Sequence, residues 1–126
     1  MKNLKLILTF LFGAIMIIAG VNHFIKPAMY APFIPEFLPN VAINYLTGFV
    51  EITLGVGVFI PKFRSMATLG ILIMMLVFLP LHIIDVFKEN PAIGSHQVAI
   101  IRLPIQFVLI LWAWFIHTGY TFPKNN

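Results

Sequence analysis

Seven polar side chains could do chemistry in this apolar chain, and each lies in or beside a long hydrophobic stretch: Asn22, His23, Glu51, His82, Asp85, Arg102 and Gln106. Glu51 is the most informative, because it lies near the middle of such a stretch with no positive charge beside it. An ionised side chain at the centre of a bilayer costs about 2.5–3.5 kcal/mol, so it is normally satisfied inside the protein and is a candidate functional residue. Together, these acids, imidazoles, amides and the guanidinium could hydrogen-bond a polar headgroup and move a proton.

Helical spacing places Glu51 on a face of small residues. Gly48, Glu51 and Gly55 recur at i, i+3 and i+7, which is one face of a helix. Small residues let neighbouring membrane helices approach closely. We therefore expect Glu51 to point into the protein rather than toward lipid.

Two further pairs of polar residues share helix faces. His82 and Asp85 stand at i, i+3, within hydrogen-bonding reach, and Arg102 and Gln106 stand at i, i+4. Glu51 and Asp85 are two acids, and Arg102 is the one permanent cation among these residues. Their net charge is −1 unless one acid stays protonated or one histidine is charged. We expect Arg102 to pair with Asp85 near the outer mouth, and the deeper Glu51 to hold a proton.

Each of these residues also has a structural interpretation. Glu51 could be a hydrogen-bond tie between helices, and Asp85 with Arg102 could form an ion pair that reaches toward lipid headgroups. His23 could be a hydrated helix end, and His82 could bond a neighbour. We expect no metal site, because the spacing of the histidines and acids resembles no compact metal motif.

Composition places the chain in a membrane. It has 126 residues, of which 60% are hydrophobic and 10% are charged, whereas soluble domains carry about 25% charged residues. The absence of cysteine excludes disulfides, thiol redox chemistry and iron–sulfur ligation. The net charge is +4, but the cations are scattered singly between apolar stretches, which favours a role in membrane orientation over nucleic-acid binding.

The hydrophobic pattern predicts an all-α protein, a four-helix transmembrane bundle formed by a single domain, residues 1–126. A spanning helix needs about 20 mostly apolar residues, and the candidate spans are residues 4–22, 41–60, 66–87 and 98–118. Between the first two spans lies a segment with four prolines and several aromatic residues, which favour the membrane interface.

Lysine and arginine predict the orientation. Five lie at the termini or in the second connection, namely Lys2, Lys5, Lys62, Arg64 and Lys124, against Lys26 and Lys88 on the other side. Because positive residues favour the cytoplasm, both termini are expected there. The polar residues of all four spans then fall in the outer half of the membrane.

Three motifs resemble those of the DoxX family of small bacterial integral membrane proteins: GVNHFIKP at residues 20–27, YLTGFVEI at 45–52 and RLPIQ at 102–106. The similarity runs over nearly the whole chain. It implies a four-helix protein of the bacterial cytoplasmic membrane and a link to quinone-dependent thiosulfate oxidation, oxidative-stress complexes or maturation of other proteins. The matching motif positions are Asn22, His23, Glu51, Arg102 and Gln106.

Two functions fit these residues. A polar pocket in the outer half of an apolar bundle suits an amphipathic ligand, such as a quinone or a lipid headgroup, without a covalently bound cofactor. Alternatively, the protein is a non-catalytic membrane partner or maturation factor, or a homo-oligomer, whose polar core serves fold specificity. Whether it is an enzyme stays open, since no nucleophile–base pair, phosphate loop or dinucleotide motif supports one. A path for ions is disfavoured by the apolar inner half.

Overall fold

A computed structural model describes residues 2–120, and it confirms an all-α protein. Four α-helices follow one another: α1 (Lys2–Ile25), α2 (Asn40–Gly57), α3 (Arg64–Phe87) and α4 (His96–Thr118). Two short 3₁₀ helices, η1 (Pro27–Met29) and η2 (Ala31–Phe33), occupy the proline-rich connection. Lys124, which entered the charge count, lies outside the described residues.

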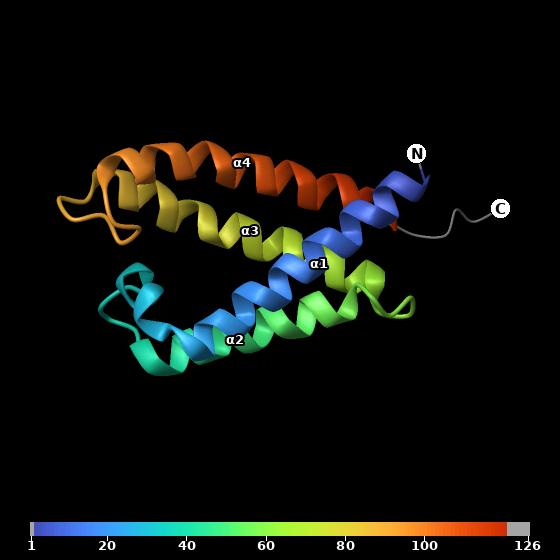
Figure 1. Cartoon of the computed structure of the whole chain (residues 1–126), viewed down its shortest axis with the longest axis horizontal. Coiled ribbons are helices and arrows are strands. Elements are labelled where there is room, and N and C mark those ends of the chain that lie inside the picture. Colours follow the sequence, from blue (N-terminus) through green and yellow to red (C-terminus); the bar gives the residue numbers. More distant parts are fainter. Residues whose placement is uncertain (1, 121–126) are drawn as a thin grey trace.

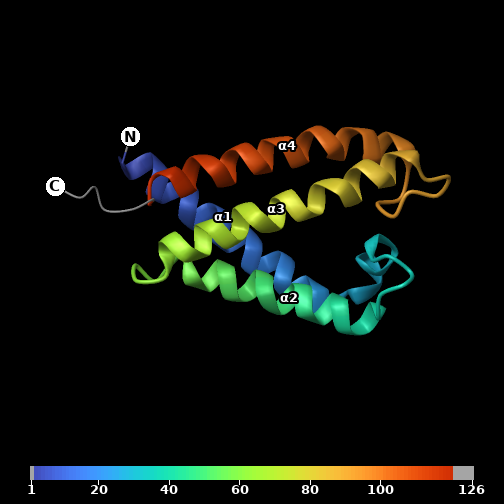
Figure 2. The same cartoon turned by 180° about the vertical axis from the view of Figure 1, so that it is seen from behind.

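The helices form two antiparallel hairpins. α1 packs along α2, and α3 packs along α4, while fewer contacts join the two pairs. The pairs diverge at the end that carries η1, η2 and the α3–α4 connection, and the start of α1 lies near the end of α4 at the opposite end (Figures 1 and 2). We call the end where the two hairpins meet the closed end and the end where they diverge the open end.

Glycines set the close approach of α1 and α2 at two levels. A Cβ added at Gly20 would lie 2.7 Å from the carbonyl oxygen of Gly48, and one added at Gly55 would lie 2.7 Å from that of Gly13. Gly13 and Gly20 are seven residues apart on α1, and Gly48 and Gly55 are seven apart on α2, so the two glycines of each helix share one face. Glu51 lies between the two levels and is 4% exposed, so its predicted inward orientation is confirmed.

The apolar core lies toward the closed end. Its buried members come from all four helices or their ends: Phe12, Met16, Val58, Ala67, Ile71, Met75, Ala113 and Ile116. This half is less uniformly apolar than expected, because Thr9 and Thr68 are also buried there. Their hydroxyls are satisfied by the carbonyl oxygens of Lys5 and Ser65, so they add no free polar group.

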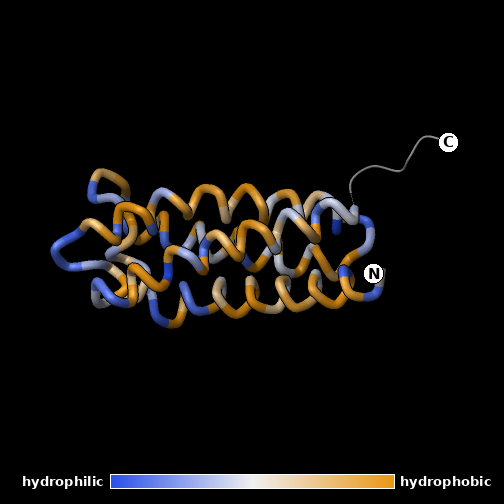
Figure 3. Tube along the Cα trace, turned by 90° about the horizontal axis from the view of Figure 1, so that it is seen from above, coloured by the Kyte–Doolittle hydropathy of each residue, from blue (hydrophilic) through white to orange (hydrophobic). Residues whose placement is uncertain are grey.

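The outward faces of the helices are apolar. Large hydrophobic side chains stay exposed along them, and hydrophobic residues dominate the middle of the molecule with most hydrophilic ones toward its ends (Figure 3). Within the described residues, three helices are long and apolar enough to cross a membrane: Asn3–Ile25, Arg64–Phe87 and His96–Thr118. These faces indicate a lipid bilayer environment.

α2 is not among those three helices, although residues 41–60 were expected to form the second span. It ends at Gly57, and its 18 residues include Asn40, Asn44 and Glu51, which lower its apolar character. Those last two polar groups are buried against α1 rather than exposed to the surroundings.

Candidate functional site

A cleft of about 620 Å³ lies between the hairpins where they diverge. Each α-helix contributes one ionisable side chain to its lining: His23, Glu51, His82 and Arg102. The connection between α1 and α2 lines the cleft with Ala28–Tyr30, Phe33–Pro35 and Leu38, and Ala92 and Ile93 of the α3–α4 connection also line it. The remaining walls are mainly aliphatic and aromatic, so a few polar groups converge in an apolar space.

Asn44 fixes His23 at the wall of the cleft. Its Nδ2 donates to the carbonyl oxygen of Pro27 at 2.8 Å, and its Oδ1 lies 2.6 Å from Nδ1 of His23. A carbonyl only accepts, so the amide orientation is set, and Nδ1 of His23 must be the donor to Oδ1. The imidazole therefore has one nitrogen left for proton exchange, Nε2, which lies 3.5 Å from Oε2 of Glu51.

Tyr30 closes the other side of the imidazole. The rings of His23 and Tyr30 stack with centroids 3.7 Å apart. Asn22 holds this tyrosine by donating from Nδ2 to its hydroxyl oxygen at 2.9 Å. Asn22 does not line the cleft itself; it positions a ring that does.

Gln106 fixes Arg102 in a similar way. Gln106 is fully buried, and its Nε2 donates to the carbonyl oxygen of Met75 on α3 at 2.6 Å. Its Oε1 is thereby left to accept from Nη2 of Arg102 at 3.0 Å. The predicted i, i+4 pair is confirmed, and it holds the guanidinium at the α4 side of the cleft.

Two buried polar atoms of the cleft lack a hydrogen-bond partner within residues 2–120, Oε2 of Glu51 and Nη1 of Arg102. The Glu51 oxygen is within ion-pair distance of His23, but 3.5 Å is longer than a normal hydrogen bond. Buried charged groups without partners cost more than neutral ones. The two side chains with a buried, unpaired polar atom thus lie on opposite hairpins and border one cavity.

The expected ion pair between Arg102 and Asp85 does not form. Asp85 is 1% exposed, and its carboxylate accepts the backbone N–H groups of Ala92 and Ile93. These N–H groups belong to the α3–α4 connection and lie closer to the carboxylate than the guanidinium of Arg102 does. Asp85 therefore shapes the mouth of the cleft and does not face into it.

His82 meets the opposite hairpin rather than its neighbour Asp85. Its ring packs edge-on against Phe33 of η2, with centroids 5.4 Å apart. Nearby, Nζ of Lys88 donates to the carbonyl oxygen of Pro32 at 3.2 Å. These two contacts join the hairpins across the mouth.

Of the seven residues singled out in the sequence, four line the cleft, and Asn22, Gln106 and Asp85 support it from outside. Asn44 was missed, although it precedes Gly48 by four residues and Glu51 by seven and so shares their helix face. Among the described residues, no three histidine or acidic side chains gather closely enough to hold a metal ion.

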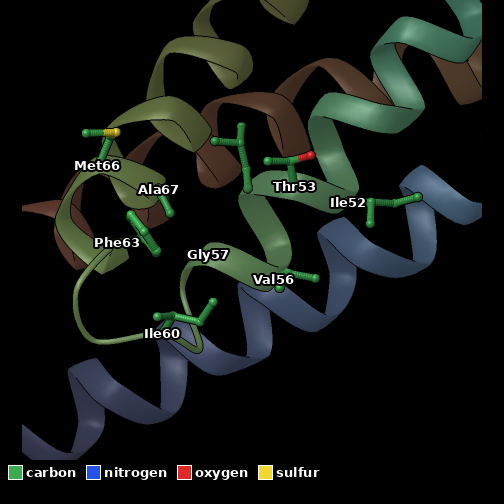
Figure 4. Close-up of a pocket in the computed structure, with 9 residues that line it drawn as sticks. Ile52, Thr53, Val56, Gly57, Ile60, Phe63, Met66 and Ala67 are labelled. Carbon is green, nitrogen blue, oxygen red and sulfur yellow. The ribbon is translucent and has the colours of Figure 1, made fainter.

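A second hollow, of about 500 Å³, lies between α2 and the start of α3. Figure 4 shows its lining, which includes Val56, Ile60 and Phe63. Its one hydroxyl, on Thr53, is already committed to the carbonyl oxygen of Phe49. This groove offers no free polar group for recognition.

The model of a family described as "Domain of unknown function (DUF8561)" matches residues 12–117. No curated protein and no solved structure matches the chain. The predicted membership of the DoxX family is therefore wrong, and the redox and oxidative-stress roles that it implied lose their support. Small and polar residues are common where membrane helices pack closely, so short motifs of them do not specify one family.

Proposed function

The chain belongs to the DUF8561 family, and we propose that it is a membrane protein that holds an amphipathic ligand in the cleft between its two hairpins. One observation carries the proposal: unsatisfied atoms of Glu51 and Arg102 border the same largely apolar cavity. A ligand with a polar head and an apolar body would satisfy both kinds of wall. A quinone and a lipid with a small headgroup are two such ligands.

The proposal includes the membrane arrangement. All four α-helices cross the bilayer, with both termini in the cytoplasm and the mouth of the cleft toward the outer face. In support, α2 runs antiparallel along α1 with the two backbones in contact at two glycine levels. Its polar face is buried against α1, so the helix pair can present apolar residues to lipid.

Thr47 offers a way to fill the cleft without touching its charged groups. Its side chain lines the cleft, and its hydroxyl is bonded within α2, to the carbonyl oxygen of Ile43. Thr53 is the matched control, because it makes the same bond to Phe49 but borders the apolar groove instead. The test compares Thr47→Phe with Thr53→Phe.

We expect the parent protein and Thr53→Phe, purified in a mild detergent, to retain a stoichiometric amphiphile in native mass spectrometry. Thr47→Phe should lose it while keeping its monodisperse elution. Retention of the same molecule by Thr47→Phe would overturn the proposal. So would a parent protein that carries no small molecule but a defined protein partner, undisturbed by Thr47→Phe, which would make the polar residues structural.

A further inference from the structure

We propose that the headgroup held in this cleft is a monoanion, a carboxylate or a phosphate diester, bound by Arg102. The inference rests on the proposed function and narrows its ligand class. It follows from a count of the charges that face the cavity and of those that are committed elsewhere.

Arg102 brings a positive charge that no carboxylate neutralises. Within residues 2–120, the one ion-pair contact joins His23 and Glu51. The partner of Arg102 is the neutral amide of Gln106, and its Nη1 has no partner. A guanidinium stays charged in proteins and binds carboxylates and phosphates through its N–H groups.

Neither acid near the cleft forms an ion pair with Arg102. Asp85 lies outside the lining and accepts two backbone N–H groups. Glu51 is the one acid in the lining, and it faces Nε2 of His23. A single proton between Nε2 and Oε2 leaves this pair without net charge, whichever atom carries it, and burial favours that neutral state.

The titratable groups that face the cavity from each element are therefore His23 from α1, Tyr30 from the connection, Glu51 from α2, His82 from α3 and Arg102 from α4. With one proton shared by Nε2 of His23 and Oε2 of Glu51, the lining holds no net negative charge to offset the guanidinium. A protonated His82 would only add to the positive charge. The cleft thus favours one negative charge on the ligand and disfavours a cation.

Matched amphiphiles test the charge directly. The purified parent, in a neutral detergent, is titrated with a long-chain fatty acid and the fatty alcohol of the same chain, and with lysophosphatidylglycerol and the matching monoacylglycerol. An alkylammonium and a short-chain quinone complete the panel. Binding is read from thermal stabilisation, which grows with ligand concentration over Kd.

We expect at least one anion of the two matched pairs to bind about tenfold or more tightly than its neutral counterpart. Arg102→Gln should remove at least about tenfold of that preference, since it deletes a charged hydrogen bond. Arg102→Lys should keep part of it. Lys26→Gln, which removes an exposed cation on the same side but outside the cleft, should leave it unchanged.

Equal binding of the anion and its neutral counterpart in both matched pairs would overturn the inference, as would a preference that survives Arg102→Gln in a variant that still elutes as a folded protein. Tighter binding of the quinone or the alkylammonium would overturn it too, yet leave the proposed function standing if Thr47→Phe abolishes that binding. Failure of every amphiphile to bind would overturn both. Comparison of the fatty acid with lysophosphatidylglycerol decides whether the bound anion is a carboxylate or a phosphate diester.

Discussion

Two buried amides fix the charged side chains of the cleft. Asn44 holds the imidazole of His23, and Gln106 holds the guanidinium of Arg102. Each amide donates to a backbone carbonyl and turns its oxygen toward the ionisable group. Because each amide is fixed by its bond to a carbonyl, the ionisable side chain beside it is held in one orientation before a ligand arrives, which lowers the cost of binding.

Asn44→Leu is expected to destabilise the protein by about 1–3 kcal/mol, because it leaves Nδ1 of His23 without a partner in a buried site. The Pro27 carbonyl loses one of its two hydrogen bonds and keeps the one from the Tyr30 N–H. Asn40→Leu is the control: it also removes a bond to a carbonyl, that of Ala31, but in an exposed position. Its cost should stay below about 1 kcal/mol. Denaturant titration of both variants in detergent measures the difference, and equal losses would contradict the role given to Asn44.

Glu51→Gln is expected to keep stability within about 1 kcal/mol of the parent, since a carboxamide has the same shape and can donate to Nε2 of His23. Glu51→Ala should cost about 1–3 kcal/mol more, because it removes buried volume and leaves Nε2 facing no partner. The same titration compares them. If Glu51→Gln lost as much as Glu51→Ala, the fold would depend on the charge of Glu51 rather than on its shape and hydrogen bond.

At the scale of the elements, the α1–α2 hairpin positions half of the site. Gly48 on α2 packs against Gly20 and His23 on α1. A Cβ added at Gly48 would meet Cβ of His23 at 2.7 Å and the carbonyl oxygen of Gly20 at 2.8 Å. Neither of these atoms can move without shifting α1. The register of the hairpin and the position of His23 in the cleft are therefore linked by one glycine.

Gly48→Ala should thus destabilise the protein by about 1–3 kcal/mol through overpacking and should also weaken retention of the cleft ligand. Gly70→Ala is the control, because the added Cβ would meet only the flexible end of the Leu54 side chain. Thermal unfolding and native mass spectrometry of both variants give the two readouts. A Gly48→Ala protein as stable and as well loaded as Gly70→Ala would show that the backbone contact does not position the site.

At the scale of the whole molecule, the two hairpins meet firmly at one end and diverge at the other. The buried apolar core occupies the closed end, and the cleft occupies the open end. Asp85 and Lys88 tie the connecting segments over the mouth. This division places recognition at one end of the molecule and most of the apolar packing at the other.

The absence of cysteine allows a direct test of the proposed four crossings. Single cysteines replace Phe37, which is 86% exposed in the first connection, and Lys62, which is exposed in the second. In intact cells, a membrane-impermeant maleimide should label Phe37→Cys, and Lys62→Cys only after permeabilisation. Labelling of both residues from one side would show that α2 does not cross the membrane.

Much of the local structure of this protein follows from the spacing of residues along the sequence. The apolar stretches predict four helices, the Gly48–Glu51–Gly55 face predicts a buried carboxylate, and the i, i+4 spacing predicts the Arg102–Gln106 bond. Each of these depends only on the helical repeat and on hydrophobicity, which act along a few turns of one helix. Asn44 could have been found by the same rule.

The tertiary structure alone decided which groups face the cleft and which are already bound. The carboxylate of Asp85 lies nearer to two backbone N–H groups of a folded connection than to Arg102, and spacing along a helix says nothing about where a loop returns. The divergence of the hairpins likewise depends on packing between helices that are distant in sequence. That packing separates one cation from both acids, and so gives the cleft the charge on which its proposed ligand depends.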